Sequence, residues 1–135
     1  MANAVYSKAR ESFLSQNPAL DFDTDTIKVM LVKVAQAFND AHQFVSDLTS
    51  GNIVARSGAL ASKTVTGGVA DAADITFTTP AAGSSCNLIV YKDTGSDATN
   101  PLIAFIDTGT GIPITTDGGD VAVQWDNGAN KIFKL

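Results

Sequence analysis

Two Asp-Thr-Gly triplets are the feature of this sequence with the clearest catalytic potential. They begin at Asp93 and at Asp107. Aspartic proteases bring two such carboxylates together, so that one shared proton lets the pair activate a water. Here a single predicted strand separates the triplets, which places them at opposite edges of a sheet, on the order of 15 Å or more apart. We interpret both triplets as turns, and a dimeric hydrolase with one triplet per subunit is the alternative.

The sequence holds one histidine, His42, and one cysteine, Cys86. A serine or thiol nucleophile would therefore have a single possible imidazole base, and two isolated residues far apart in the chain do not form a motif. Zinc is not indicated, because such sites need three or four protein ligands. Cys86 precedes an apolar run and is expected to be buried, and it cannot form an intramolecular disulfide.

Two acidic groups have the residue types that bind calcium: Asp117 with Asp120, and Asp71 with Asp74. Neither follows the spacing of an EF-hand loop, so we expect them to serve turns and solubility. The glycines match no phosphate-binding fingerprint, because no strand-loop-helix unit surrounds them. The sequence therefore predicts no catalytic residue, no metal and no cofactor.

Composition excludes several classes of partner. The formal net charge is −5 and the nine Lys and Arg residues are scattered, whereas binding to nucleic acid needs a concentrated basic face. The most apolar run, residues 27–35, is interrupted by Lys28 and Lys33 and is too short to span a bilayer. The first residues lack the pattern of a signal peptide. With 44% hydrophobic and 17% charged residues, the chain is expected to be globular.

Residues 1–18 are predicted to form an N-terminal helix that begins after Asn3 as N-cap and ends near Pro18. Its apolar stripe follows helical spacing and consists of Val5, Tyr6, Ala9, Phe13 and Leu14. We expect this stripe to dock on the protein's own sheet or on a neighbouring subunit. On this view, deletion of residues 2–16 weakens assembly more than it unfolds the rest.

Residues 19–135 change to short apolar runs separated by Gly, Asp, Asn, Ser and Pro, which is typical of a β domain. The predicted strands are residues 26–34, 53–56, 63–66, 74–79, 87–92, 102–107, 120–125 and 131–135, with a short helical turn within 41–48. Strand 26–34 is expected to be central, and 87–92 is expected to pair with 102–107. The sequence Asn127-Gly128 predicts a tight hairpin between the last two strands.

The predicted fold is therefore a mainly β, single-domain antiparallel β-sandwich or partly closed barrel of about seven or eight strands with one N-terminal α-helix. Trp125 and Tyr91 have the ring types on which a glycan could stack, but their strand positions favour core packing.

Five segments together resemble a family of small structural proteins of tailed bacteriophages, which are encoded among head and tail genes and regarded as capsid decoration or cement proteins. These segments are distributed over nearly the whole chain and comprise residues 25–29, 42–48, 63–71, 91–95 and 125–135. The resemblance carries over no catalytic residue.

The resemblance implies a structural virion protein, most specifically a decoration protein on the capsid exterior that is assembled in the bacterial host cytoplasm. Its expected partners are the major capsid protein and further copies of itself, with a trimer favoured, and neither nucleic acid nor membrane is expected to bind directly. A tail, neck or fibre component is the alternative. An aspartic-type hydrolase and a glycan-binding module on the virion are readings from other classes.

Overall fold

The computed structural model describes residues 3–109, 111–125, 128–129 and 131–135. In this part of the chain, strands account for 34% of the residues and helices for 12%, so the protein is mainly β, as predicted. The strands form antiparallel sheets without a closed barrel, which agrees with a β-sandwich. The strands are β1 (Ala4–Val5), β2 (Ile27–Lys33), β3 (Ile53–Arg56), β4 (Thr64–Thr66), β5 (Val69–Asp71), β6 (Ile75–Phe77), β7 (Ser85–Lys92), β8 (Leu102–Ile106), β9 (Ile114–Thr115), β10 (Val121–Val123) and β11 (Phe133–Lys134). The helices are α1 (Ser7–Ser15) and the 3-10 turns η1 (Val45–Asp47) and η2 (Ser50–Asn52).

The main sheet has the strand order β1-β8-β7-β2-β3. The short strand β9 pairs with the beginning of β7, at Ser85 and Cys86. The central strand β2 lies between β7 and β3, as predicted from its apolar residues on both faces. β7 pairs with β8 across the connection of residues 93–101, also as predicted. Continuous apolar runs of this kind occur where both faces of a sheet are covered.

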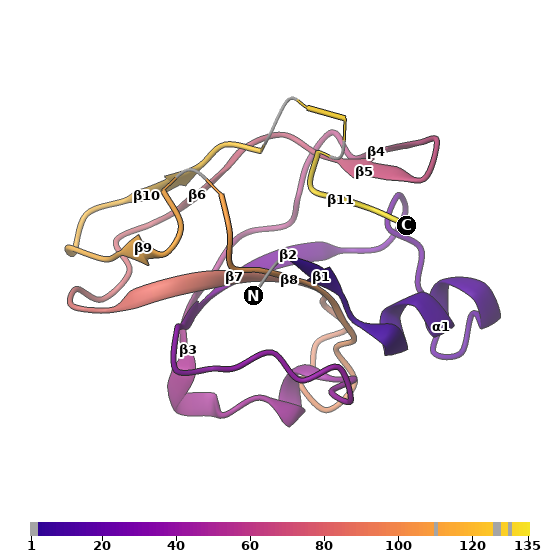
Figure 1. The fold of residues 1–135 in the computed structure, drawn as a ribbon, viewed down its shortest axis with the longest axis horizontal. Coiled ribbons are helices and arrows are strands. Elements are labelled where there is room, and N and C mark those ends of the chain that lie inside the picture. Colours follow the sequence, from indigo (N-terminus) through magenta and orange to yellow (C-terminus); the bar gives the residue numbers. More distant parts are fainter. Residues whose placement is uncertain (1–2, 110, 126–127, 130) are drawn as a thin grey trace.

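Figure 1 shows what covers the two faces. Two small sheets, β10-β6 and β11-β5-β4, lie above the main sheet, and the segment from β2 to β3, with η1 and η2, lies below it. On the lower face, the ring of Phe38 packs between those of Tyr6 and Phe105, at 5.0 and 5.6 Å between ring centroids. One cluster of buried side chains joins the main sheet to the upper layer, from Val5 to Phe133.

The helix α1 ends where the sequence predicts, because Gln16 takes a left-handed conformation ahead of Asn17 and Pro18. Its start differs from the prediction. Tyr6 is the N-cap residue, but its side chain forms no capping hydrogen bond. Instead, the carboxylate of Asp40 accepts a hydrogen bond from the backbone N–H of Ser7 at 2.8 Å and another from the Ser7 hydroxyl. The prediction of Asn3 as N-cap is therefore wrong.

The N-terminal segment is also part of the core. β1 pairs with β8, and Tyr6 is 1% exposed. Docking on the protein's own sheet is thus what the structure shows for this segment. Deletion of residues 2–16 would remove core side chains, so point changes test a contact made by α1 more cleanly.

The predicted hairpin between the last two strands is wrong. β10 pairs with β6, whereas β11 pairs with β5 in another sheet. Residues 126–127 and 130 of the predicted turn lie outside the described residues. The local turn signal yields here to long-range pairing, in which Val121 lies opposite Phe77 and Phe133 lies opposite Ala70.

Candidate functional site

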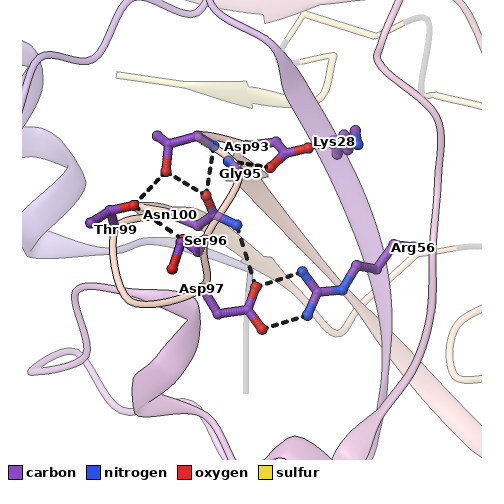
Figure 2. Close-up of polar contacts among 9 residues, drawn as sticks. Lys28, Arg56, Asp93, Gly95, Ser96, Asp97, Thr99 and Asn100 are labelled. Carbon is purple, nitrogen blue, oxygen red and sulfur yellow. Dashed lines mark hydrogen bonds and ion pairs between the residues drawn. The ribbon is translucent and has the colours of Figure 1, made fainter.

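The first Asp-Thr-Gly triplet begins the β7–β8 connection, where polar contacts gather (Figure 2). Asp93 Oδ2 lies 2.6 Å from Nζ of Lys28, which comes from the neighbouring strand β2. Asp93 Oδ1 accepts the backbone N–H of Gly95 at 3.0 Å. The Lys28 hydrogen bond and then the Gly95 N–H lower the pKa of Asp93 below its usual value. Asp93 is therefore an ionised turn residue and half of an ion pair.

A second ion pair holds the other side of this connection. Both terminal guanidinium nitrogens of Arg56 donate to the carboxylate of Asp97, at 2.7 and 2.8 Å (Figure 2). The guanidinium also lies 5.6 Å from the centroid of the Tyr91 ring. The hydrogen bond from Arg56 is the largest cause that lowers the pKa of Asp97. Because both side chains are more than a third exposed, we expect the pair to contribute no more than about 1 kcal/mol to stability.

Asn100 is the buried centre of the connection. Its Oδ1 accepts the backbone N–H of Thr94 at 2.6 Å and the Thr94 hydroxyl at 2.8 Å. The segment below the sheet fastens the connection from outside, since Val45 N–H donates to the carbonyl oxygen of Asn100 and Ser46 N–H donates to that of Asp97. The polar groups of this loop therefore bind one another and fix its shape.

The second Asp-Thr-Gly triplet is tied to the N-terminal segment. Oδ1 of Asn3 accepts the backbone N–H groups of Asp107 and Thr108, each at 2.9 Å, and the Thr108 hydroxyl at 3.0 Å. Asn3 thus stabilises a turn after β8.

The two triplets lie at opposite ends of the β7–β8 pair, as predicted. Ile106 lies opposite Leu88, and Leu102 lies opposite Tyr91, so Asp107 and Asp93 are separated by nearly the full length of β7. At about 3.4 Å per residue this amounts to about 15 Å or more. Two carboxylates at that distance cannot share a proton, so one copy of the chain does not assemble the aspartic-protease pair.

His42 and Cys86 also lie far apart. His42 precedes Gln43, whose carbonyl oxygen accepts the backbone N–H of Leu102, and Leu102 lies opposite Tyr91 at one end of β7. Cys86 is five residues further along β7, on the order of 15 Å away. Cys86 is fully buried, as predicted, and burial raises the pKa of its thiol. A thiol-imidazole pair is not formed.

The acidic groups considered for calcium serve turns and backbone contacts. Asp117 accepts the N–H of Gly119, and Asp120 accepts that of Thr79. Asp74 accepts the N–H of Trp125, and Asp71 lies 4.0 Å from the ammonium group of Lys131. Across the described ranges, no three His, Cys, Asp or Glu side chains come together in a way that could hold a metal ion.

Trp125 and Tyr91 are core residues, as their strand positions predicted. Trp125 is buried, and its indole Nε1–H donates to the carbonyl oxygen of Ala73 at 3.1 Å. Tyr91 is 1% exposed beneath Arg56. Neither ring presents an open face on which a sugar could stack.

A cleft of about 830 Å³ lies between the β1–β8 edge and the C-terminal segment. Its described lining includes the cations Arg10, Lys131 and Lys134. Among all the described residues that line the cleft, Thr108 supplies the one side-chain hydroxyl. None of these described residues is an acid, a histidine or a cysteine. The described walls therefore lack an acid-base pair.

A second hollow, which we name the Val65 groove, lies between the end of α1, the β4–β5 hairpin and the C-terminal strand. It has a volume of about 220 Å³ and is lined by Phe13, Leu20, Asp21, Phe22, Asp23, Val65, Gly68, Ala70, Phe133 and Leu135. Val65 and Leu135 are each 53% exposed. Leu14, which follows Phe13 in α1, is 89% exposed. Three of the four large apolar side chains that are exposed in the described part thus line the groove or adjoin its lining in sequence; the fourth is Val34.

No family model matches the chain, and no curated protein matches it. Within the described residues, no helix has the length and apolar character needed to cross a membrane. The geometry offers three surface features, namely the fastened β7–β8 connection, the cationic cleft and the Val65 groove.

Sequence reasoning identified Asp93 and Asp107 but missed the residues that fix them. Lys28 lies 65 residues before Asp93, and Asn3 lies 104 residues before Asp107, so no local spacing links them. The Val65 groove was missed for the same reason, because it joins residues from both ends of the chain. The one available signal was Leu14, whose place at the edge of the predicted helical stripe leaves it outside the core.

The carboxylates of Asp47, Asp93 and Asp97 predict that the protein loses stability in acid. The pKa of Asp47 is lowered mainly by the backbone N–H groups of Phe44 and Gln43, and those of Asp93 and Asp97 are lowered by their cations. A carboxyl with a lower pKa in the folded state stabilises the fold above its unfolded pKa, which is near 4, and this contribution disappears as pH falls below that value. We therefore expect the urea midpoint to be constant from pH 7 to 5 and to fall steadily from pH 4 to 2.

The variant Asp47→Asn provides the control, because it keeps a side-chain oxygen near both N–H groups but does not titrate. Its midpoint should fall less than that of the wild type between pH 5 and pH 2. An equal fall in both proteins would show that Asp47 does not contribute to the acid dependence.

Proposed function

We propose that this chain is a structural protein of a tailed-phage virion, and specifically a capsid decoration protein that binds the major capsid lattice. The five segments that resemble that family are distributed from residue 25 to residue 135. The observation that carries the proposal is the Val65 groove, an apolar hollow with exposed Val65 and Leu135 on a protein whose neighbouring polar loops are satisfied internally. Exposed apolar surface of this kind marks contacts with other proteins.

The polar contacts support the same proposal. Asp93, Asp97 and Asn100 bind other residues of the chain, so the β7–β8 connection has a fixed shape. A rigid surface is suited to repeated docking, because it loses little conformational freedom on binding. Many copies on a lattice, organised as trimers, need only modest affinity each, since avidity supplies the strength.

Copy number per particle tests the proposal. We expect quantitative mass spectrometry of purified virions to find the chain in a fixed stoichiometric ratio to the major capsid protein, and cryo-electron microscopy to place it on the capsid exterior. If only a few copies were found, at the neck or tail, the chain would instead be a tail, neck or fibre component. Virions without the chain would exclude both.

A further inference from the structure

The Val65 groove is open along one side, because β4 is an outer strand of its sheet. In the described part, β5 is the strand partner of β4, and Thr64, Val65 and Thr66 are all exposed. The hairpin turns at Gly67 and Gly68, both with positive φ, so Thr66 and Val69 flank a two-residue turn. In this register Val65 takes the non-hydrogen-bonded position opposite Ala70, which directs its N–H and C=O to the free edge.

The edge has little of the usual protection against strand addition. Proteins protect outer strands by short length, charged residues, proline or bulges; β4 is short, with three residues, but it reads Thr-Val-Thr in regular register. The nearest cation in sequence, Lys63, directs its ammonium group to the carbonyl oxygen of Asp25. A further strand could therefore pair with β4 and lie along the groove.

The size of the groove fits side chains of a peptide. Pockets for small-molecule ligands usually have volumes of about 300–1,000 Å³. At about 220 Å³, with Phe22, Ala70 and Phe133 in its lining, the Val65 groove has room for one or two aliphatic side chains.

Its rim is acidic. Asp21 and Asp23 line the groove, and neither forms an ion pair within the part of the chain that the structure describes. Asp21 Oδ1 accepts the N–H groups of Asp23 and Thr24, which fixes its carboxylate in place. Asp25, by contrast, is paired with Lys92 at 3.0 Å. A lysine or arginine on the occupant would compensate the charge of the rim.

We propose that an extended segment of a different protein adds to the free edge of β4, with an aliphatic side chain in the Val65 groove and a Lys or Arg beside Asp21 and Asp23. Pairing by main-chain hydrogen bonds, with side chains in adjacent hollows, is a recurrent mode of peptide binding. A second copy of this chain is disfavoured as the occupant. Joining two β4 edges would bring two acidic rims together, and each chain carries a net charge of −5. The identity of the partner rests on the proposed function, according to which the added segment belongs to the major capsid protein.

Titration of the isotope-labelled full chain by NMR tests the inference. The probe is a blocked seven-residue peptide of alternating Lys and Val, and the matched probe replaces each Lys by Glu. We expect shift changes at β4, residues 20–23 and β11 with the Lys peptide, and at least about tenfold weaker binding of the Glu peptide. No binding of the Lys peptide at millimolar concentration, equal binding of both peptides, or shift changes elsewhere would overturn the inference.

Three variants sharpen the test. Val65→Pro removes the outward N–H without touching the β4–β5 bonds and should weaken binding at least about tenfold, because proline is tolerated at such edge positions. Asp23→Asn should weaken binding and reduce its salt dependence. Val34→Lys changes an exposed apolar residue outside the groove and should have no effect. Equal binding by Val65→Pro and wild type, with both spectra showing a folded chain, would contradict the strand pairing.

Two further results separate this inference from the proposed function. Self-association of the wild type that Val65→Pro abolishes would identify a second copy as the occupant and overturn the inference. A chain that binds the Lys peptide at the groove but is absent from virions would retain the docking site and exclude the capsid role.

Discussion

Replacing Phe133 by alanine is expected to lower the free energy of unfolding by about 3–5 kcal/mol. Phe133 is a buried residue of the short strand β11, and its ring meets Phe22 edge-on at 5.5 Å and Phe13 at 6.4 Å between centroids. The ring thus joins α1 and the segment after it to the upper layer, and its loss removes part of the floor of the Val65 groove. Urea unfolding monitored by circular dichroism measures the change.

Phe133→Leu is the matched control, because it keeps much of the apolar volume and should cost less than half as much. If Phe133→Ala changed the free energy of unfolding by less than about 1 kcal/mol, β11 would contribute little to the fold, and the groove would lack a rigid floor.

Tyr6→Ala is expected to have an effect of similar size, about 3–5 kcal/mol. The side chain is 1% exposed, and its ring lies 5.0 Å from that of Phe38 on the lower face of the main sheet. The backbone of Tyr6 adds to this role, since its N–H donates to the carbonyl oxygen of Ile103 and its own carbonyl oxygen accepts the N–H groups of Ala9 and Arg10. Thermal unfolding of purified protein provides the measurement.

Two companion variants separate packing from surface contact. Tyr6→Phe keeps the ring and should change stability by less than about 1.5 kcal/mol. Leu14→Lys alters a side chain that is 89% exposed and should leave stability within about 0.5 kcal/mol. Loss of assembly in Leu14→Lys with unchanged stability would assign a contact to α1, whereas a large loss of stability would show that Leu14 belongs to the core.

The long buried strands could be predicted from sequence because each is apolar on both faces. β2, β7 and β8 fall at the predicted places, since continuous runs such as Leu102–Ile106 have few other stable positions in a small protein. The strands β1, β5 and β9 were not predicted: β1 lies in the segment assigned to the helix, and β5 and β9 have only three and two residues. They also raise the number of strands above the seven or eight expected.

The error at the C-terminus has a related cause. A turn signal at Asn127-Gly128 reports a local preference, whereas the partners of β10 and β11 are decided by apolar residues more than forty positions earlier in the chain, such as Phe77 and Ala70. Turn chemistry was sufficient to interpret Asp93 and Asp107. It could not identify Lys28 as the partner of Asp93 or Asn3 as the partner of Asp107, because these contacts depend on strand order.

The outer strands of the two larger sheets differ in how readily they could accept an added strand. β3 closes one side of the main sheet and ends at Arg56, whose charge and bidentate contact discourage strand addition, and β1 on the other side is only two residues long. β4 is also short, with three residues, but none of them is charged. Strand addition by another protein should therefore occur at Thr64–Thr66, and a single lysine there would inhibit it more than one placed beside β3.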